Sequence, residues 1–111
     1  MSTRSPITTH VLDTSIGRPA QGIEVRLERA GKEIARGETN GDGRVADLLA
    51  PGSLERGTYR ITFATGPYFA KRNIDCFYPE VSIVFTIEAT GEHYHVPLLL
   101  NPFGYSTYRG S

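Results

Sequence analysis

Histidine is the side chain best suited to acid–base chemistry near neutral pH, and this 111-residue sequence contains three. An unperturbed imidazole has a pKa of about 6.5, so it can take up or release a proton in that range. His93 and His95 are two positions apart and project to the same side if their segment is a strand. His10 lies within residues 7–13, where alternation places it on the same face as Thr8. Taken singly, each histidine is also compatible with an ordinary half-exposed strand position.

The same three histidines leave a metal site open as an alternative. Zinc binds neutral imidazole, and two histidines at i and i+2 on a strand can supply ligands together with a third from elsewhere. No cysteine and no cluster of acidic residues lies close in sequence to reinforce such a site. We therefore predict no metal ligands, and zinc binding by His10, His93 and His95 is the minor alternative.

Arg44 is the candidate cationic group, because it follows the four turn-forming residues Asn40-Gly41-Asp42-Gly43. Such a turn can present the planar guanidinium to a carbonyl or an enolate of a substrate. The same turn can equally end in a solvated charge, and spacing alone does not decide between the two.

The sequence closes on Tyr108-Arg109-Gly110-Ser111. Chain ends are usually frayed and tolerant of change. An aromatic ring, a guanidinium and a hydroxyl within four residues can also complete a pocket. Residue types alone leave both interpretations of the tail open.

Period-two alternation of apolar and polar residues is the dominant pattern, and it predicts strands with one buried face. The clearest runs are residues 7–13, 23–28, 59–63 and 81–87. Turns containing glycine separate them, at residues 30–31, 40–43, 51–52 and 90–91. Residues 66–73 have proline near the start and basic residues near the end, as a short helix would. The pattern predicts an all-β, antiparallel β-sandwich with one short helix, as a single domain over residues 1–111.

Composition excludes several classes of function. The 12 basic and 12 acidic side chains give a formal net charge of zero, so no electrostatic footprint for nucleic acid or an anionic membrane is present. The aliphatic run 98–100 is far shorter than the roughly 20 residues of a membrane span. Residues 1–6 have no apolar stretch behind them, as a secretory signal would. The single cysteine, Cys76, has no basic partner nearby in sequence; we do not predict it as a nucleophile, and it fits a reducing cytoplasm.

Two longer motifs resemble the transthyretin-like family. Residues 10–20 (HVLDTSIGRPA) resemble its N-terminal motif, and residues 93–107 (HYHVPLLLNPFGYST) resemble its C-terminal motif. The resemblance covers almost the whole chain. Within the family, the hormone carrier has lysine in place of His10 and threonine in place of His95, and it lacks the terminal YRGS tetrapeptide. At all three places this sequence is similar to the hydrolytic branch of the family.

That resemblance implies a transthyretin-like Greek-key sandwich of about eight strands and an activity in urate degradation. The implied reaction is hydrolysis of 5-hydroxyisourate to 2-oxo-4-hydroxy-4-carboxy-5-ureidoimidazoline, with no cofactor. The implied catalytic residues are His10, Arg44, His95 and Ser111, and the substrate contacts are His10, Arg44 and Tyr108. The histidines would activate water, Arg44 would polarise the substrate, and the Ser111 hydroxyl or terminal carboxylate would orient a histidine or water. The implied assembly is a homotetramer, a dimer of dimers whose active sites lie in the channel where the dimers meet.

Two other classes of function stay open at this point. The same sandwich can hold a small aromatic ligand in its channel without turning it over, although His10, His95 and the terminal tetrapeptide argue against a pure carrier. A structural immunoglobulin-like module inside a larger assembly would use neither the histidines nor the tail. His93 is left outside the predicted core set, as a same-face neighbour of His95.

Overall fold

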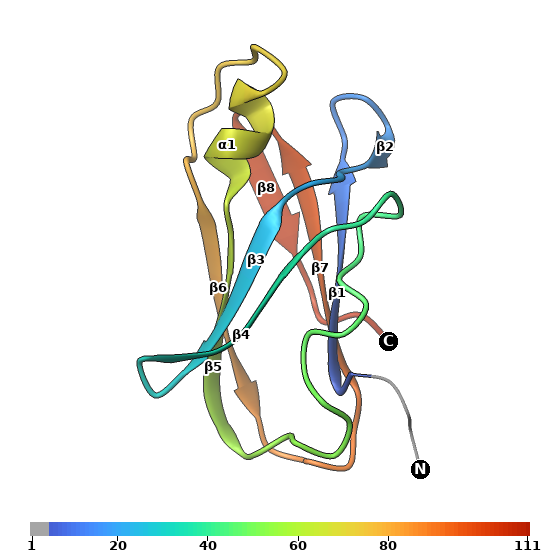
Figure 1. Cartoon of the computed structure of the whole chain (residues 1–111), viewed down its shortest axis with the longest axis vertical. Coiled ribbons are helices and arrows are strands. Elements are labelled where there is room, and N and C mark those ends of the chain that lie inside the picture. The colour runs from blue at the N-terminus through green and yellow to red at the C-terminus, as the bar shows by residue number, and fades with distance from the viewer. Residues whose placement is uncertain (1–4) are drawn as a thin grey trace.

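Eight strands and one short helix form within residues 5–111, the part of the chain that the computed structural model describes. In chain order they are β1 (Ile7–Asp13), β2 (Arg18–Pro19), β3 (Glu24–Arg29), β4 (Lys32–Glu38), β5 (Gly57–Phe63), α1 (Thr65–Ala70), β6 (Val81–Ile87), β7 (Tyr94–Asn101) and β8 (Gly104–Thr107). They build two four-stranded sheets, in the order β2-β1-β7-β8 and β4-β3-β5-β6, that pack face to face (Figure 1). The predicted all-β sandwich with one short helix is confirmed.

One strand pair departs from a purely antiparallel sandwich. β1 and β7 run parallel, in a register from Ile7 opposite Tyr94 to Asp13 opposite Leu100, whereas the other pairs of strands are antiparallel. Parallel neighbours need a long crossover connection, and here the crossover contains the whole second sheet, β3 to β6. Alternation within one strand says nothing about the direction of its neighbour, so the sequence pattern could not distinguish this pair.

The alternation of each strand decides which side chains fill the sandwich. Along β1 the residues alternate strictly between buried and half-buried, so Thr8 and His10 share one face, as predicted, and that face is the outer one. A slip of one residue would turn the apolar set of β1 outward, so burial fixes this assignment. The largest fully buried side chains come from both sheets and from α1, and include Tyr59, Ile61, Phe63, Tyr68, Phe69, Leu98 and Leu100.

The turns and the helix follow the sequence closely. Ala30 and Gly31 have φ angles of +53° and +76°, which lets two residues close the β3–β4 hairpin. The helix predicted within residues 66–73 forms as α1 and lies at one end of the sandwich, at the top of Figure 1. It is shorter than expected, because Asn73 has a φ angle of +57° and turns the chain soon after it.

A buried tyrosine–aspartate contact joins α1 to the end of β1. Tyr68 Oη donates a 2.7 Å hydrogen bond to Asp13 Oδ2, and both side chains are buried. The second carboxylate oxygen of Asp13 accepts hydrogen bonds from the amide and the hydroxyl of Ser15, at 3.0 and 2.5 Å. Burial and the Asp13 carboxylate raise the pKa of Tyr68 to about 12, although Arg72 over its ring acts in the opposite direction.

Because of Tyr68, the free energy of unfolding is expected to fall between about pH 10 and about pH 12. An unfolded tyrosine ionises near pH 10 and Tyr68 in the fold only near 12, so the unfolded state loses its proton first. The stabilisation is therefore complete below pH 10 and is lost as the pH rises, by up to about 1.4 kcal/mol per pH unit. Tyr68→Phe should remove this slope, whereas Tyr105→Phe, at an exposed ring, should retain it. Denaturant titrations of the three proteins between about pH 10 and about pH 12 give the free energy of unfolding at each pH. If it fell equally steeply with pH in all three proteins, Tyr68 would not be its cause.

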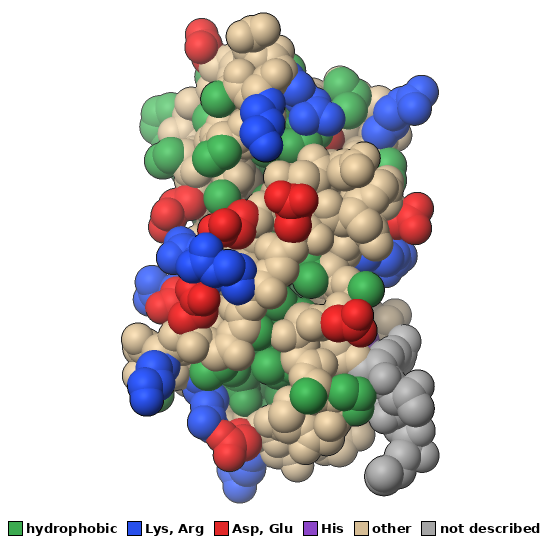
Figure 2. Space-filling model, in the orientation of Figure 1, with side chains coloured by type: hydrophobic (Ala, Val, Ile, Leu, Met, Phe, Trp, Pro, Cys, Tyr) green, Lys and Arg blue, Asp and Glu red, His purple; other side chains and the backbone are tan. Residues whose placement is uncertain are grey.

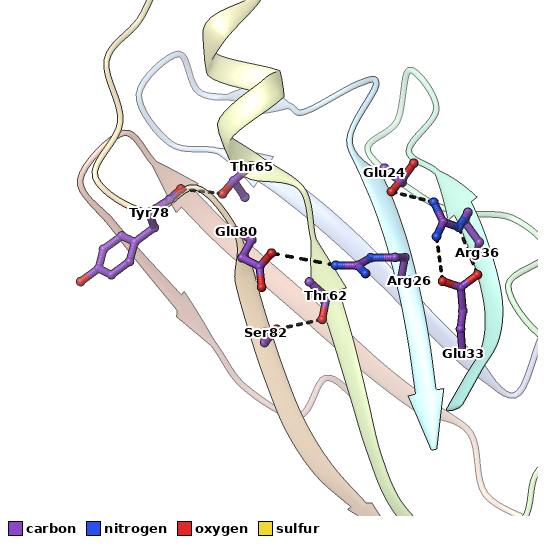
Figure 3. Close-up of polar contacts among 9 residues, drawn as sticks. All are labelled: Glu24, Arg26, Glu33, Arg36, Thr62, Thr65, Tyr78, Glu80 and Ser82. Carbon is purple, nitrogen blue, oxygen red and sulfur yellow. Dashed lines mark hydrogen bonds and ion pairs between the residues drawn. The ribbon is translucent and has the colours of Figure 1, made fainter. Parts of the chain in front are cut away.

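The outer face of the β4-β3-β5-β6 sheet carries exposed ion pairs. Arg36 pairs with Glu24 at 3.0 Å and with Glu33 at 2.7 Å, and Arg26 pairs with Glu80 at 3.9 Å (Figure 3). Acidic and basic side chains are interleaved over the face seen in Figure 2, with no large area of one sign. Exposed pairs of this kind contribute little to stability, because water and salt screen them. The outer face of this sheet is thus an ordinary solvated surface, and His10 and His95 belong to the other sheet.

Within residues 5–111, no helix has the length and apolar character needed to cross a bilayer. The interpretation of residues 1–6 as lacking a secretory signal falls largely on residues 1–4, which lie outside the described part of the chain. Cys76 is a free, partly buried thiol whose sulfur lies 3.7 Å from the carbonyl oxygen of Tyr78.

Candidate functional site

The parallel pairing of β1 with β7 brings the histidines together on the outer face of their sheet. In its register Thr8 lies opposite His95, and His10 lies opposite Pro97. On the other side of β1, His10 forms an isolated antiparallel bridge with Arg44. Directly opposite residues of a sheet share a face and have Cβ atoms about 5 Å apart. The side chains of His10, His95 and Arg44 therefore meet on one surface, although they are far apart in the sequence.

The turn before Arg44 docks this residue against β1. The Asn40 side-chain oxygen accepts a hydrogen bond from the Arg44 amide at 3.1 Å, and the Asn40 amide donates to the Arg44 carbonyl at 2.8 Å. The carbonyl of Gly43 accepts a hydrogen bond from the Val11 amide at 2.8 Å. Gly43 has a φ angle of +74°, and a Cβ there would lie 2.4 Å from the Val11 carbonyl oxygen. Asn40 shapes the turn, and Gly43 allows its close approach to β1.

An open cavity of about 430 Å³ lies over this surface. Of the predicted site residues, Arg44, His95 and Ser111 line it. His10 is not part of the lining, but it lies close enough for its charge to act on His95. The remaining lining residues are Thr8, Thr9, Asn40, Val45, Ala46 and His93.

Thr8 and His93 belong to this site, although sequence reasoning left both without a role. Thr8 Oγ1 lies 2.8 Å from His95 Nδ1 and 2.8 Å from His93 Nε2. Alternation already placed Thr8 on the face of His10, and His93 on the side of His95. The missing information was the β1–β7 register, because only the register puts the hydroxyl between the two rings.

The surroundings of His95 favour its neutral form. Partial burial lowers the pKa of His95 below its ordinary value, and the charge of Arg44 lowers it further, as does positive charge on His10 or His93 when those rings are protonated. A hydrogen bond to the Thr8 backbone acts in the opposite direction but is the weakest of these influences. A neutral imidazole has one bare nitrogen and can accept a proton. Because Nδ1 contacts Thr8, Nε2 is the nitrogen available to a water molecule or a substrate.

Arg109 holds the C-terminal segment against the end of β7. Its guanidinium pairs with Glu92 at 2.9 Å and lies over the Tyr94 ring, 4.5 Å from the centroid. Tyr94 is itself fixed, because its hydroxyl donates to the Ala89 carbonyl at 3.0 Å and accepts from the Ala89 amide at 3.1 Å. The arginine of the tetrapeptide thus has a structural role beside the site.

Gly110 brings the backbone of the tail into contact with His95. Its amide donates a 2.8 Å hydrogen bond to the His95 carbonyl. A Cβ at Gly110 would lie 2.4 Å from His95 Cδ2, which is closer than real Cβ atoms approach, so glycine is needed at this position. Next to it, Ser111 reaches the cavity.

Tyr108 lies away from the cavity that the other predicted residues share. It is 60% exposed and lines a separate groove of about 250 Å³, together with Arg109, Phe85 of β6 and the other side of His95. Tyr108 therefore does not reach the cavity that Arg44, His95 and Ser111 share, and its role as a substrate contact stays a prediction.

The arrangement supplies what hydrolysis of an activated carbonyl needs. A neutral imidazole can take a proton from water, and a nearby guanidinium can stabilise the oxyanion that forms. In the described part of the chain, no three side chains of histidine, cysteine, aspartate or glutamate gather as a metal-ligand set. His93 and His95 both contact the Thr8 hydroxyl, and His10 pairs with Arg44 through a backbone bridge.

Comparison with known proteins gives results that agree with this site. Residues 7–110 match the model of the HIUase/Transthyretin family. The 5-hydroxyisourate hydrolase of Mus musculus is 48% identical over 113 aligned residues, which cover 96% of this chain and 96% of the mouse protein.

Solved structures show the same fold in a 5-hydroxyisourate hydrolase and in a protein in complex with thyroxine. The 5-hydroxyisourate hydrolase of Klebsiella pneumoniae matches with a TM-score of 0.86 and 41% identity, over 95% of this chain and 98% of that one. Sea bream transthyretin, in complex with thyroxine, matches with a TM-score of 0.90 and 28% identity, over 96% and 95%. The fold alone therefore does not separate the two activities. Its sequence and its architecture both show that the chain belongs to the HIUase/Transthyretin family.

Proposed function

We propose that this protein hydrolyses 5-hydroxyisourate to 2-oxo-4-hydroxy-4-carboxy-5-ureidoimidazoline in the degradation of urate. The observation that carries the proposal is the cavity shared by His95, Arg44 and Ser111, with His10 beside it. The 48% identity with the mouse 5-hydroxyisourate hydrolase over nearly all of both chains supports the choice of substrate.

His95 is the proposed base for water, because it lines the cavity and its surroundings favour the neutral ring. His95 takes one proton as the water oxygen bonds to a ring carbonyl carbon of the substrate. Arg44 holds that carbonyl and stabilises the negative charge that develops on its oxygen. The carbon–nitrogen bond then breaks, and the captured proton passes to the departing nitrogen, directly or through His10. Every proton transferred in these reaction steps comes from water, and no step requires a metal or a cofactor.

Ser111 and Tyr108 complete the proposed site. Ser111 reaches the same cavity as His95, so its hydroxyl can orient the attacking water or the histidine. Tyr108 is exposed in the single subunit, and a role in substrate contact requires that another subunit cover it. Its proposed function therefore depends on the assembly.

The proposed assembly is a homotetramer, a dimer of dimers with the active sites between dimers. β6 and β8 are edge strands of the two sheets, and edge strands have unpaired backbone groups that can pair with another chain. Val84 of β6 exposes 56% of its surface. The cavity is open on one side, so a second subunit can supply its missing wall. Light scattering should give about four times the 12.2 kDa mass of the chain, and a monomer at assay concentrations would contradict this.

The function is tested by generating 5-hydroxyisourate in situ from urate with urate oxidase and following the ultraviolet absorbance of 5-hydroxyisourate. The protein should speed the decay over the spontaneous rate, and a variant lacking Ser111 should do so less well. A chelator added to both reactions should leave the rates unchanged. No acceleration by a correctly assembled protein would contradict the hydrolase and favour a carrier with the same fold, as in sea bream transthyretin.

The acidic limb of the pH profile is expected below the ordinary histidine pKa. Protonation of His95 removes the base, and burial together with nearby positive charge lowers the pKa at which this occurs. The value of kcat/KM should therefore hold as the pH falls through 6.5, the ordinary value for histidine, and decline only at lower pH. If kcat/KM of the wild-type protein already declined at or above pH 6.5, His95 would not be the titrating base.

We also propose that residues 1–111 form one domain and that the protein works in the cytoplasm. A free thiol such as Cys76 persists in a reducing compartment, which supports the second point. The location is tested by imaging a fluorescent fusion of the protein in cells, which should show a cytoplasmic distribution.

A further inference from the structure

A single hydroxyl connects two histidine rings at the site. Thr8 Oγ1 lies 2.8 Å from His95 Nδ1 and 2.8 Å from His93 Nε2. A hydroxyl has one proton to donate, so Thr8 cannot donate to both rings at once. At least one ring must donate to Oγ1, and the proton positions on the two rings are therefore coupled.

The direction of these hydrogen bonds decides whether His95 can act as a base. If Thr8 donated to His95 Nδ1, the neutral ring would have its proton on Nε2 and no bare nitrogen toward the cavity. If His95 Nδ1–H donates to Thr8, Nε2 is bare and can accept a proton from water. The Thr8 hydroxyl proton is then directed to His93 Nε2, at the same distance on its other side.

We propose that Thr8 and His93 are positioning residues that hold neutral His95 in the Nδ1–H tautomer, with Nε2 bare toward the substrate. His93 accepts from Thr8 through Nε2, so its own proton is on Nδ1. The inference rests on the proposed function, in which His95 is the base. It gives a role to Thr8 and His93, two of the cavity residues that the proposed reaction leaves unused.

The backbone supports this chain of hydrogen bonds. Thr8 is opposite His95 in the continuous β1–β7 register, so the pairing of the two strands keeps the Thr8 hydroxyl next to the His95 ring. The carbonyl of His95 accepts a hydrogen bond from the Gly110 amide on the other side of β7. The ring is therefore located from both neighbouring segments, and Thr8 decides which nitrogen has the proton.

Nitrogen NMR of protein labelled with 15N-histidine tests the tautomer directly. The chain has only three histidines. Each ring is therefore assigned by the loss of its signals in a variant in which that one histidine is replaced. At mildly alkaline pH, His95 and His93 should both be protonated on Nδ1. A proton on Nε2 of His95, or on Nε2 of His93, would overturn the proposal.

Matched variants test whether the tautomer matters for turnover. Thr8→Val keeps the shape but removes the hydroxyl, and should lower kcat by about tenfold or more with little change in KM, because the tautomer of a catalytic histidine controls its basicity. Thr8→Ser keeps the hydroxyl and should stay within about threefold of wild type by the same argument. His93→Gln keeps an acceptor near the position of Nε2, whereas His93→Phe does not, so only the second should lose activity. Equal activity of Thr8→Val and Thr8→Ser would overturn the proposal.

A double variant separates a shared pathway from two independent effects. If Thr8 and His93 act through the same chain, Thr8→Val with His93→Phe should lose no more than Thr8→Val alone. Additive losses would contradict the chain. If the wild-type protein did not hydrolyse the substrate, the proposed function would fail, whereas the NMR measurement would still decide the tautomer.

Discussion

Replacing His95 with alanine is expected to lower kcat by roughly 10²- to 10⁴-fold, the range that a positioned general base contributes. The residue lines the cavity, its pKa is lowered by burial and by the positive charges around it, and its Nε2 is free for water. KM should change much less, because the base acts mainly in the transition state. The rate of 5-hydroxyisourate decay at substrate saturation measures the effect.

His95→Asn is the matched control for the position of the side chain. Its amide can still hydrogen-bond with Thr8 at the place of Nδ1, but it has no nitrogen that can accept a proton from water. The variant should fold and assemble like the wild type and be as inactive as His95→Ala. Near-normal turnover by His95→Asn would show that the residue is a structural group and not the base. His10→Ala and Arg44→Ala should also fold and lose most of their turnover, and normal rates in all three alanine variants would reject the site.

Gly110→Ala is expected to lower kcat by about 100-fold. The added Cβ would meet His95 Cδ2 at 2.4 Å, whereas ordinary contacts begin near 3.4 Å, so the tail or the ring must move by about 1 Å. A displacement of about 1 Å in a catalytic group can reduce the rate about 100-fold. Stability should change little, because the tail contributes only one backbone hydrogen bond through this residue.

Gly91→Ala is the matched control for this substitution. It adds the same methyl group at a turn where a Cβ would meet nothing within 4 Å, and the Gly91 backbone does not need a positive φ angle. Its activity and its melting temperature should match those of the wild type. If Gly110→Ala kept activity within about threefold of Gly91→Ala, the tail would not position His95 or Ser111 in the way argued from contact geometry.

The sequence by itself determined the local structure and the types of residue at the site. Alternation predicted the principal strands and placed His10 on the same face of β1 as Thr8, because side chains in a strand alternate with a period of two. The Ala30-Gly31 turn and the short helix α1 were also predictable, since both depend on conformational preferences of neighbouring residues. The turn at residues 40–43 singled out Arg44, and the motif resemblance singled out His95 and Ser111; the structure brings all three to one cavity.

Only the tertiary structure decided how these residues meet. The parallel β1–β7 pairing depends on a connection through the whole second sheet, and no short-range pattern encodes its direction or register. The register places Thr8 between His93 and His95, and the approach of the tail makes glycine necessary at position 110. These are contacts between residues more than 80 positions apart or packed against another segment. Local propensities act over a few residues, so they fix each strand separately, whereas burial of the shared core fixes the strands relative to one another.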